Sequence, residues 1–377
     1  MIIISYHSKI NKKNLQKIIC RLKRKCALLK VCPIKLIIQI KTYESELIGL
    51  DKSTIFKMVQ DYLNDTPLLL LGTGASIPVG IPGMPLLAEH LRNELSDKYK
   101  TNTNWERFVE NLDKGLGLEQ ALTDVTMDEN IEQDIKKCTW ELVSKSDIEL
   151  FEKLLNSSES LALAKLLYQF YQAHPCCINI ITTNYDRMIE YACDQASLPL
   201  DIRFSGTYIK RTSTVPPCNR NIVNLYKVHG SLDSFVDTKG RVVSIPLQNK
   251  IPDGCVPSII TPGTNKYKEI LLGPAHNILQ EADNAFKSAS SFLCIGYGFN
   301  DGQIQKNLLQ EASNGKPLVV ITKELSDAAF GLLCNSCSKY IVIQEGKAKD
   351  TTEFWIGKEC QVVSGTFWGI DGFLEII

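Results

Sequence analysis

The sequence lacks any hydrophobic run that could cross a membrane. Although 44% of its 377 residues are hydrophobic, no stretch approaches the roughly 20 consecutive apolar residues that a spanning helix needs. The opening MIIISYHSK is also shorter than the apolar core of a signal peptide, which takes roughly 7–15 residues. These absences favour a cytoplasmic globular protein with one large or two smaller α/β domains and no membrane attachment.

Acidic residues are missing from the start of the chain. Between Met1 and Tyr43 there are eleven Lys or Arg and no Asp or Glu. The remainder carries 31 basic and 42 acidic side chains, a net charge of −11, although the formal charge of the whole chain is zero. An acidic body repels a phosphate backbone, so we expect no direct nucleic-acid binding by it.

The thirteen cysteines lack the pattern of a disulfide framework or a zinc site. They are odd in number and scattered, and several lie in apolar segments, as is typical of buried thiols in a reducing compartment. Cys334 and Cys337 form one CxxC with no second pair. Because a tetrahedral zinc site needs four ligands, we expect no metal.

Residues 1–50 are interpreted as an extension, and residues 51–377 as the folded domain. The stretch KKNLQKIICRLKRKCALLK predicts a basic amphipathic helix before Pro33, and IKLIIQIK alternates like a strand. Three interpretations of this extension stay open: an interaction arm, a surface for an anionic partner, or a translated upstream segment that does not fold.

From there on, apolar strand patterns alternate with amphipathic helix patterns. Such alternation predicts an α/β fold with a doubly wound, mostly parallel sheet. A polar helical stretch over about 101–160, anchored by Trp105, Phe108 and Trp140, predicts a helical insertion that covers one side of the sheet. The predicted strands are 68–71, 178–183, 222–229, 257–260, 291–298, 318–322 and 340–344. A turn, GSLDS (230–234), is predicted to follow the strand 222–229.

The first predicted strand runs into the turn GTGASIPVGIP (72–82). Four consecutive leucines precede this turn, as is typical of a strand buried on both faces. Glycine has no Cβ, so backbone at Gly72 and Gly74 can approach a phosphate closely, and the N–H groups that follow, up to Ser76, can point at the anion. The turn therefore predicts a nucleotide site; the alternative is a tight turn with no ligand.

Polar residues follow three other predicted strands. Because the carboxyl ends of parallel strands meet at one edge, we expect these residues to converge near Gly72. Each also has a structural alternative: Asp186 could cap the next helix, His229 could be a buried structural histidine, and GYG could be a close-packing turn. The residues concerned are Asn184 and Asp186, then His229 and Gly230, then Gly296, Gly298, Asn300 and Asp301.

In order and spacing, these motifs resemble the sirtuin-like NAD-consuming proteins over about residues 60–301. The family pattern is matched by GTGAS-IPVGIP (72–82), TTNYD (182–186), HG (229–230) and GYG (296–298). The resemblance implies a Rossmann-like sheet and NAD as a substrate.

Two departures separate the chain from the deacylating sirtuins. Gly83, Met84 and Pro85 follow GIP where those enzymes continue with Asp-Phe-Arg. Residues 230–295 contain only Cys255 and Cys294, so the four-cysteine zinc module is missing. These features are similar to the bacterial sirtuin-like branch that hydrolyses NAD in anti-phage defence. The compact chain is further similar to the subunit that assembles with a HerA-type hexameric ATPase, which implies a homo-oligomer and an ATPase partner.

The resemblance also implies roles for individual residues. Asn184 would hold the ribose or the attacking water, His229 would accept a proton, and Asp186 would receive the carboxamide of nicotinamide. Within the cofactor-binding set, the first glycine turn would cradle the pyrophosphate, Ile81 and Pro82 would line the nicotinamide pocket, and Gly296 and Tyr297 would touch the adenosine ribose or phosphate. The full set is Gly72, Gly74, Ala75, Ser76, Ile81, Pro82, Thr183, Tyr185, Gly296, Tyr297 and Asp301.

The expected reaction is the release of nicotinamide and ADP-ribose from NAD, and three alternatives stay open. An NAD-dependent deacylase or ADP-ribosyltransferase would need an acceptor groove beside His229. A nucleotide-sensing scaffold would bind without turnover. An ordinary Rossmann oxidoreductase needs an acidic ribose-binding residue at the end of the second strand, about 20 residues beyond the glycines; Glu89 and Glu94 lie near that distance but within a predicted helix.

Overall fold

The computed structural model describes residues 50–377, except 124, 174–176, 214, 218–219 and 264–274. The predictions made for residues 1–49 lie outside this description. Residues 52–377 form one compact unit. No helix in the described part of the chain is both long and apolar enough to cross a membrane.

The main sheet has nine strands in the order β14-β13-β12-β11-β10-β1-β2-β6-β3. The strands from β12 to β3 are parallel, and β13 and β14 add an antiparallel hairpin at one edge. The six strands from β12 to β6 have the order typical of dinucleotide-binding folds. The predicted doubly wound, mostly parallel fold is therefore confirmed. The strands are β1 (Leu68–Leu71), β2 (Ile178–Thr182), β3 (Leu200–Asp201), β6 (Val223–Lys227), β10 (Phe292–Ile295), β11 (Leu318–Thr322), β12 (Tyr340–Glu345), β13 (Thr351–Ile356) and β14 (Glu359–Ser364).

Helices cover both faces of this sheet because its central strands are apolar on both sides. In β1, Leu69 and Leu71 join the apolar core on one face, and Leu68 and Leu70 join the core on the other. The first core takes side chains from α3 (Lys52–Tyr62), α7 (Glu129–Asn156), α8 (Ala162–Ala173), α9 (Met188–Gln195) and α14 (Ile370–Phe373). The second takes side chains from α11 (Ala275–Ser288), α12 (Gly302–Ser313) and α13 (Asp327–Ser336).

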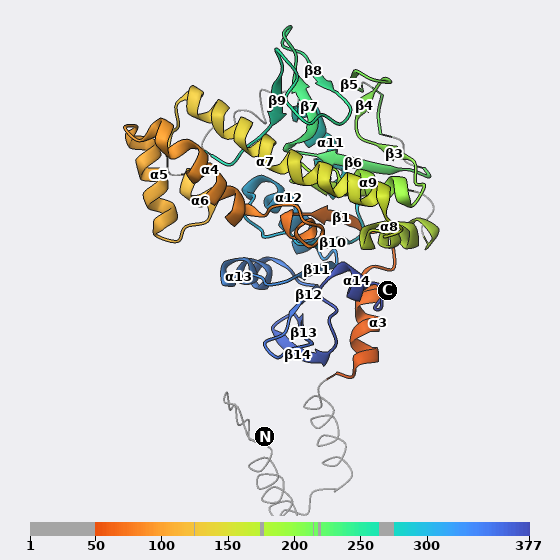
Figure 1. The fold of residues 1–377 in the computed structure, drawn as a ribbon. Helices are drawn as coiled ribbons and strands as arrows, with labels where there is room; N and C mark the ends of the chain where they lie inside the picture. Colours follow the sequence, from red (N-terminus) through yellow and green to blue (C-terminus); the bar gives the residue numbers. More distant parts are fainter. Residues whose placement is uncertain (1–49, 124, 174–176, 214, 218–219, 264–274) are drawn as a thin grey trace, which may run out of the picture. The chain divides into compact units, whose positions relative to one another are not determined.

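The helices predicted over 101–160 are present. The insertion consists of α5 (Thr103–Asp113), α6 (Leu118–Thr123) and α7, which pack with α4 (Met84–Tyr99) around a small core of their own that holds Trp105 and Phe108 (Figure 1). Trp140 of α7 is buried instead in the main core. Asn102 begins α5 by accepting hydrogen bonds from the backbone N–H groups of Asn104 and Trp105, both at 3.0 Å.

A second, antiparallel sheet takes strands from both sides of β6 in the chain, and it corrects one sequence prediction. Residues 230–234, GSLDS, were expected to form a turn, but they begin a strand that pairs with two others. Leu232 and Phe235 of that strand are buried, and its pairing partners lie further along the chain, where local sequence gives no sign of them. The order of this sheet is β4-β5-β8-β7-β9, with β4 (Phe204–Ser205), β5 (Lys210–Thr212), β7 (Gly230–Val236), β8 (Val242–Ser244) and β9 (Val256–Ile259).

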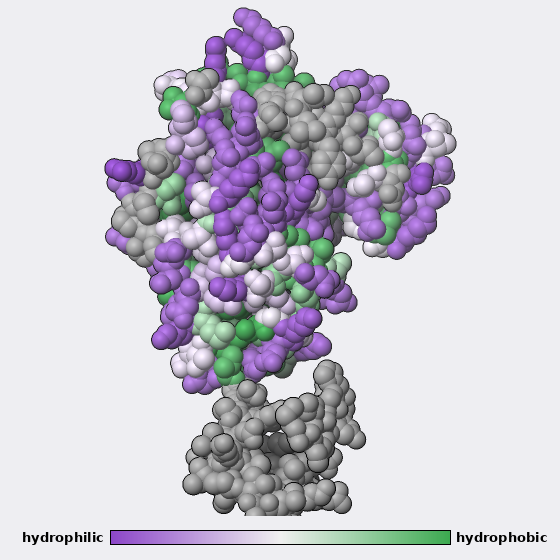
Figure 2. Space-filling model, turned by 180° about the vertical axis from the view of Figure 1, so that it is seen from behind, coloured by the Kyte–Doolittle hydropathy of each residue, from purple (hydrophilic) through white to green (hydrophobic). Residues whose placement is uncertain are grey.

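The surface is largely polar. Figure 2 shows hydrophilic residues over most of one face, with hydrophobic residues in separate small groups. The large apolar side chains that are exposed come from well-separated elements, for example Leu86, Leu155, Tyr208 and Val362. Scattered exposure of this kind is ordinary for a globular protein.

Candidate active site

The four motifs singled out in the sequence lie along one edge of the main sheet. The strands β10, β1, β2 and β6 are adjacent and parallel, so their carboxyl ends carry Gly296, Gly72, Asn184 and His229 respectively. This is the edge at which doubly wound sheets bind ligands.

The two glycine turns pack directly on each other. The N–H of Gly74 donates to the carbonyl oxygen of Gly296 at 3.0 Å. A Cβ added at Gly72 would lie 2.5 Å from that same oxygen, and one added at Gly296 would lie 2.2 Å from the backbone nitrogen of Ala75. Gly296 also has φ +57°, a conformation that favours glycine. Close approach of two backbones is therefore sufficient reason for glycine at these positions.

Most backbone N–H groups of the first glycine turn already donate hydrogen bonds within the protein. It forms two short 3₁₀ helices, η1 (Thr73–Ala75) and η2 (Ile77–Val79). The N–H groups of Gly72, Ala75 and Ser76 donate to the carbonyls of Ile295, Gly72 and Thr73, each at 3.0 Å. A role for this turn in cradling pyrophosphate stays a prediction, and Gly74 is the one of its predicted residues that is well exposed.

Asn184 is held at the end of β2 by the first glycine turn and by Thr182. Its Nδ2 donates to the carbonyl of Gly72 at 3.0 Å and to Ser76 Oγ at 3.1 Å, and its backbone N–H donates to Thr182 Oγ1 at 3.1 Å. The residue is 4% exposed, and its Oδ1 has no hydrogen-bond partner among the described residues. A buried acceptor without a partner is costly, by about 1–3 kcal/mol, unless a ligand or water supplies a donor.

Asp186 lies just before α9 and belongs to this cluster. Its Oδ1 accepts from the backbone N–H of Met188, the first residue of that helix, at 3.1 Å, while Arg187 occupies the N-cap position. Burial raises the pKa of Asp186, and the nearby ammonium of Lys227 opposes that increase. Ser76 also lies close enough to this carboxyl group to lower its pKa, and the Ser76 Oγ accepts from Asn184 Nδ2, so Asn184, Ser76 and Asp186 are neighbours.

Two charged pairs, neither foreseen from the sequence, support the loop that carries these residues. Arg187 is paired with Asp147 of α7, with Nη2 2.5 Å and Nε 2.9 Å from Oδ2. Lys227 donates to the Asp186 carbonyl at 2.5 Å and to Glu190 Oε1 at 2.8 Å. A lysine at the end of a buried, mostly apolar strand is a signal that the sequence shows. An aspartate in the middle of a polar helix is not.

His229 lies just beyond β6 and faces a carboxylate. Its Nε2 is 2.8 Å from Asp301 Oδ2, and both side chains are buried, at 9% and 6% exposure. The oxygen lies off the line of the ring N–H, so the contact acts mainly through charge. The backbone carbonyl of His229 accepts from the N–H of Ile260 at 2.9 Å, which ties the residue to the end of β9.

The two predicted tyrosines have structural partners. Tyr185 Oη donates to the Ile260 carbonyl at 2.7 Å, and Tyr297 Oη donates to the Asp301 carbonyl at 3.4 Å. Both rings are buried, and burial raises the pKa of Tyr297. Of the other predicted residues, Ala75 and Ile81 are buried, while Thr183 and Pro82 are half-buried.

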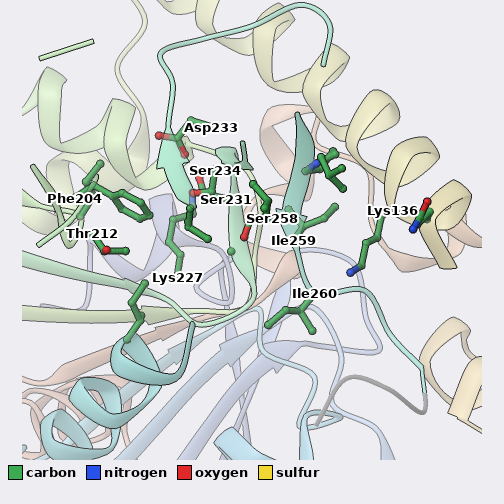
Figure 3. Close-up of a pocket in the computed structure, with 18 of the residues that line it drawn as sticks. Lys136, Phe204, Thr212, Lys227, Ser231, Asp233, Ser234, Ser258, Ile259 and Ile260 are labelled. Carbon is green, nitrogen blue, oxygen red and sulfur yellow. The ribbon is translucent and has the colours of Figure 1, made fainter. Parts of the chain in front are cut away.

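A cavity of about 730 Å³ lies beside the second sheet (Figure 3). Lys227, Gly230 and Ser231 line it, so it includes residues on either side of His229 in the chain. Two buried oxygens in its lining, Ser231 Oγ and Glu190 Oε2, have no hydrogen-bond partner among the described residues. Apolar side chains from the second sheet complete it, including Phe204, Val236, Val242 and Ile259, together with Ile260 just after β9.

The Rossmann-type α/β fold and the motifs at its strand ends agree with one family profile. A profile described as a SIR2-like domain matches residues 178–324, from β2 to just beyond β11. This segment contains Asn184, Asp186, His229, Gly296 and Asp301 but not the first glycine turn. It is less than half of the chain, and it supports a sirtuin-like, NAD-related assignment for that part.

Solved sirtuin structures align with much of the chain, at low sequence identity and with TM-scores near 0.4. The structure entitled "Structure of Sir2Tm bound to a propionylated peptide" has 14% identity and a TM-score of 0.40, covering 76% of this chain and 91% of that one. For "Sir2-p53 peptide-NAD+" the values are 15%, 0.39, 76% and 91%. No curated protein matches the chain at a significant level. The assignment of the site therefore depends on its own residues.

Proposed function

We propose that the protein hydrolyses NAD to nicotinamide and ADP-ribose. One observation carries the proposal: the adjacent ends of β2 and β6 hold Asn184, a buried amide whose Oδ1 has no partner among the described residues, and His229, an imidazole beside a carboxylate. An amide acceptor and a base at the ligand-binding edge of a Rossmann-type sheet are what cleavage of a ribosyl bond requires. The SIR2-like match over the same segment supports this choice of substrate.

The chemistry defines what the residues have to do. The bond between the ribose C1′ and the nicotinamide nitrogen breaks, and its electron pair goes to the positively charged ring, which leaves neutral. Charge develops on the sugar as in glycoside cleavage, and a water oxygen bonds to C1′ while losing a proton to a base. The products are nicotinamide, ADP-ribose and one proton.

Each proposed role fits the contacts of its residue. Asn184 would accept a hydrogen bond from a ribose hydroxyl or the attacking water through Oδ1, while its Nδ2 stays bound to Gly72 and Ser76. His229 would take the proton from that water. Asp186, with its pKa raised by burial, can hold a proton and pair with the nicotinamide carboxamide, which offers both a donor and an acceptor.

The test is nicotinamide release by purified protein. Asn184→Ala and His229→Ala should each lower kcat by about 10²–10⁴-fold, the usual effect of losing a general base or its equivalent. His90→Ala, on α4, is the matched control and should keep wild-type activity. Circular dichroism and Tm establish that the variants are folded. Full activity in both Asn184→Ala and His229→Ala would overturn the proposal.

ADP-ribosyl transfer is a second candidate because the cavity beside Gly230 offers room for an acceptor. Ser231 Oγ and Glu190 Oε2, which have no hydrogen-bond partner within the described part of the chain, could bind an amine or hydroxyl compound in place of water. Mass analysis of products formed from NAD with and without an amine acceptor distinguishes transfer from hydrolysis, and an acylated peptide tests the deacylase alternative. NAD binding with no turnover under any of these conditions would instead indicate a nucleotide-sensing scaffold.

The cellular role is a further part of the proposal and rests on the resemblance stated above. NAD hydrolysis by a sirtuin-like protein would serve bacterial anti-phage defence by depleting NAD, within a homo-oligomer and in complex with a HerA-type ATPase. Light scattering on the purified protein measures its oligomeric state. Nicotinamide release measured with and without an ATPase encoded beside its gene tests the partnership.

A further inference from the structure

The two carboxylate oxygens of Asp301 contact different groups. Oδ1 accepts from the backbone N–H groups of Gln303 and Ile304 at 3.1 and 3.0 Å, and so caps α12. Oδ2 lies 2.8 Å from His229 Nε2. The side chain is 6% exposed, so the carboxylate and the imidazole share an environment with little water.

The cap alone does not explain a charged residue at this position. Asn, Ser or Thr caps a helix about as well as Asp, and at α5 Asn102 accepts the same pair of backbone N–H groups without a charge. Burying a carboxylate is costly unless its charge is compensated. At Asp301 the two amides and the positive end of the α12 dipole stabilise the anion, and His229 is positioned to use its charge.

The contact distinguishes the two nitrogens of His229. A carboxylate beside Nε2 favours the tautomer that carries its proton there. Nδ1 makes no hydrogen bond with the described part of the chain, so it is left for a substrate or water. When Nδ1 accepts a proton, the ring becomes a cation, and the neighbouring carboxylate stabilises it.

We propose that Asp301 is a positioning residue for His229: it holds the proton on Nε2, presents Nδ1 as the base, and stabilises the imidazolium formed in the reaction. This inference rests on the proposed NAD hydrolysis. It replaces the cofactor-binding role that the sequence predicted for Asp301, because the carboxylate contacts the base and the helix end.

Asp301→Asn tests the inference by removing the charge and keeping the cap. We expect kcat to fall at least 10-fold, within the range of about 10- to 10⁴-fold known for partners that orient a catalytic histidine. The Kd of ADP-ribose, measured by calorimetry, should change less than twofold. Asn102→Ala, which removes the similar cap of α5, should lower Tm and leave kcat unchanged. A weaker ADP-ribose complex with unchanged kcat would make Asp301 a ligand contact and overturn the inference.

A second measurement does not depend on activity. In protein labelled with ¹⁵N-histidine, the His229 imidazole signals are assigned by their loss in His229→Gln. We expect the Nε2–H tautomer in the wild type and a shift towards the other tautomer in Asp301→Asn. An Nδ1–H tautomer in the wild type would overturn the inference. If the expected tautomers appear but NAD is not hydrolysed, the proposed function fails and the pairing stands. Asp301→Ser, which keeps a capping oxygen, replaces Asp301→Asn if that variant does not fold.

Discussion

At the scale of single residues, several positions satisfy more than one physical demand. Gly72, Gly74 and Gly296 allow two backbones to touch, while the same turns lie at the ligand-binding edge of the sheet. Asp186 accepts a hydrogen bond from the first backbone N–H of α9 and also lies beside Ser76 in the polar cluster. The structural and functional interpretations of these residues are therefore compatible, and variants must be chosen to separate them.

Two glycines with similar positive φ angles allow the destabilising effect of backbone crowding to be distinguished from that of a left-handed conformation. Gly296 has φ +57° and Gly357 has φ +60°, but an added Cβ meets backbone only at Gly296, since nothing lies within 4 Å of one at Gly357. We expect Gly357→Ala to lower the free energy of unfolding by about 1–2 kcal/mol. Gly296→Ala should cost about 1–3 kcal/mol more, measured by urea denaturation. An equal loss of unfolding free energy in the two variants would mean that the turn at Gly296 is not in close contact with the first glycine turn.

The raised pKa of Asp186 predicts how stability changes with pH. Because burial raises this pKa, the folded state binds the proton more tightly than the unfolded state does. The resulting contribution to the free energy of unfolding is complete below the unfolded-state pKa of about 3.9, and it is lost as pH rises through the folded-state pKa. Asp186→Asn cannot lose this contribution, because its amide does not titrate. The free energy of unfolding of the variant, relative to that of the wild type, should therefore increase between pH 4 and the folded-state pKa of Asp186.

Asp237 provides the control with the opposite sign. Hydrogen bonding to Arg241 lowers its pKa to about 2, so its contribution is present above the unfolded-state value and is lost as pH falls. Asp237→Asn should therefore lose stability relative to wild type as pH rises from about 2 to 5. Parallel pH profiles for the two variants would contradict the assignment at Asp186.

At the scale of elements, α7 connects the separate parts of the site. Trp140, Ser144 and Asp147 lie on one stripe of this helix, at helical spacing. Trp140 Nε1 donates to the Leu232 carbonyl of β7 at 2.8 Å, and Ser144 Oγ donates to the Gln248 carbonyl at 3.3 Å. Asp147 accepts from the backbone N–H of Arg187 at 2.7 Å, next to Asp186. The insertion thus holds both the β2 loop and the strand that follows His229.

Removing the central contact of α7 should affect both stability and activity. Asp147→Ala leaves the Arg187 guanidinium buried without its carboxylate, which costs about 3–5 kcal/mol. We expect lower nicotinamide release as well, because the Asp186 loop loses its anchor. On the same helix, Lys153→Ala removes an exposed ion pair with Glu159 and should cost about 0–1 kcal/mol with no loss of activity. Similar effects of the two changes would contradict the anchoring role.

At the scale of the whole molecule, sheet order determines where the site can be. The order β12-β11-β10-β1-β2-β6 puts the change of winding direction between β10 and β1, where doubly wound folds form a crevice. Here the two glycine turns fill that position, and Gly74, Gly298 and Asn300 remain exposed beside it. A dinucleotide would therefore contact the outer side of these turns.

Three strands of the second sheet, β7, β8 and β9, lie in the part of the chain between His229 and the late glycine turn. Among the described residues, no group of three or more His, Cys, Asp or Glu side chains could hold a metal ion. We expect treatment with EDTA or 1,10-phenanthroline to leave Tm and nicotinamide release unchanged. A Tm that falls with chelator and recovers on addition of Zn²⁺ would contradict this expectation.

The sequence by itself determined the features that depend on short-range pattern. The leucine run, the strand–helix alternation and the helices over 101–160 follow from periodicity, and parallel pairing then brings the four motifs to one edge. Only the tertiary structure decided that GSLDS is a strand, that Asp301 faces His229 and that Asp147 anchors Arg187. Each of these depends on groups distant in sequence that become neighbours when the chain packs, and no local pattern encodes which partner a strand or a charge will meet.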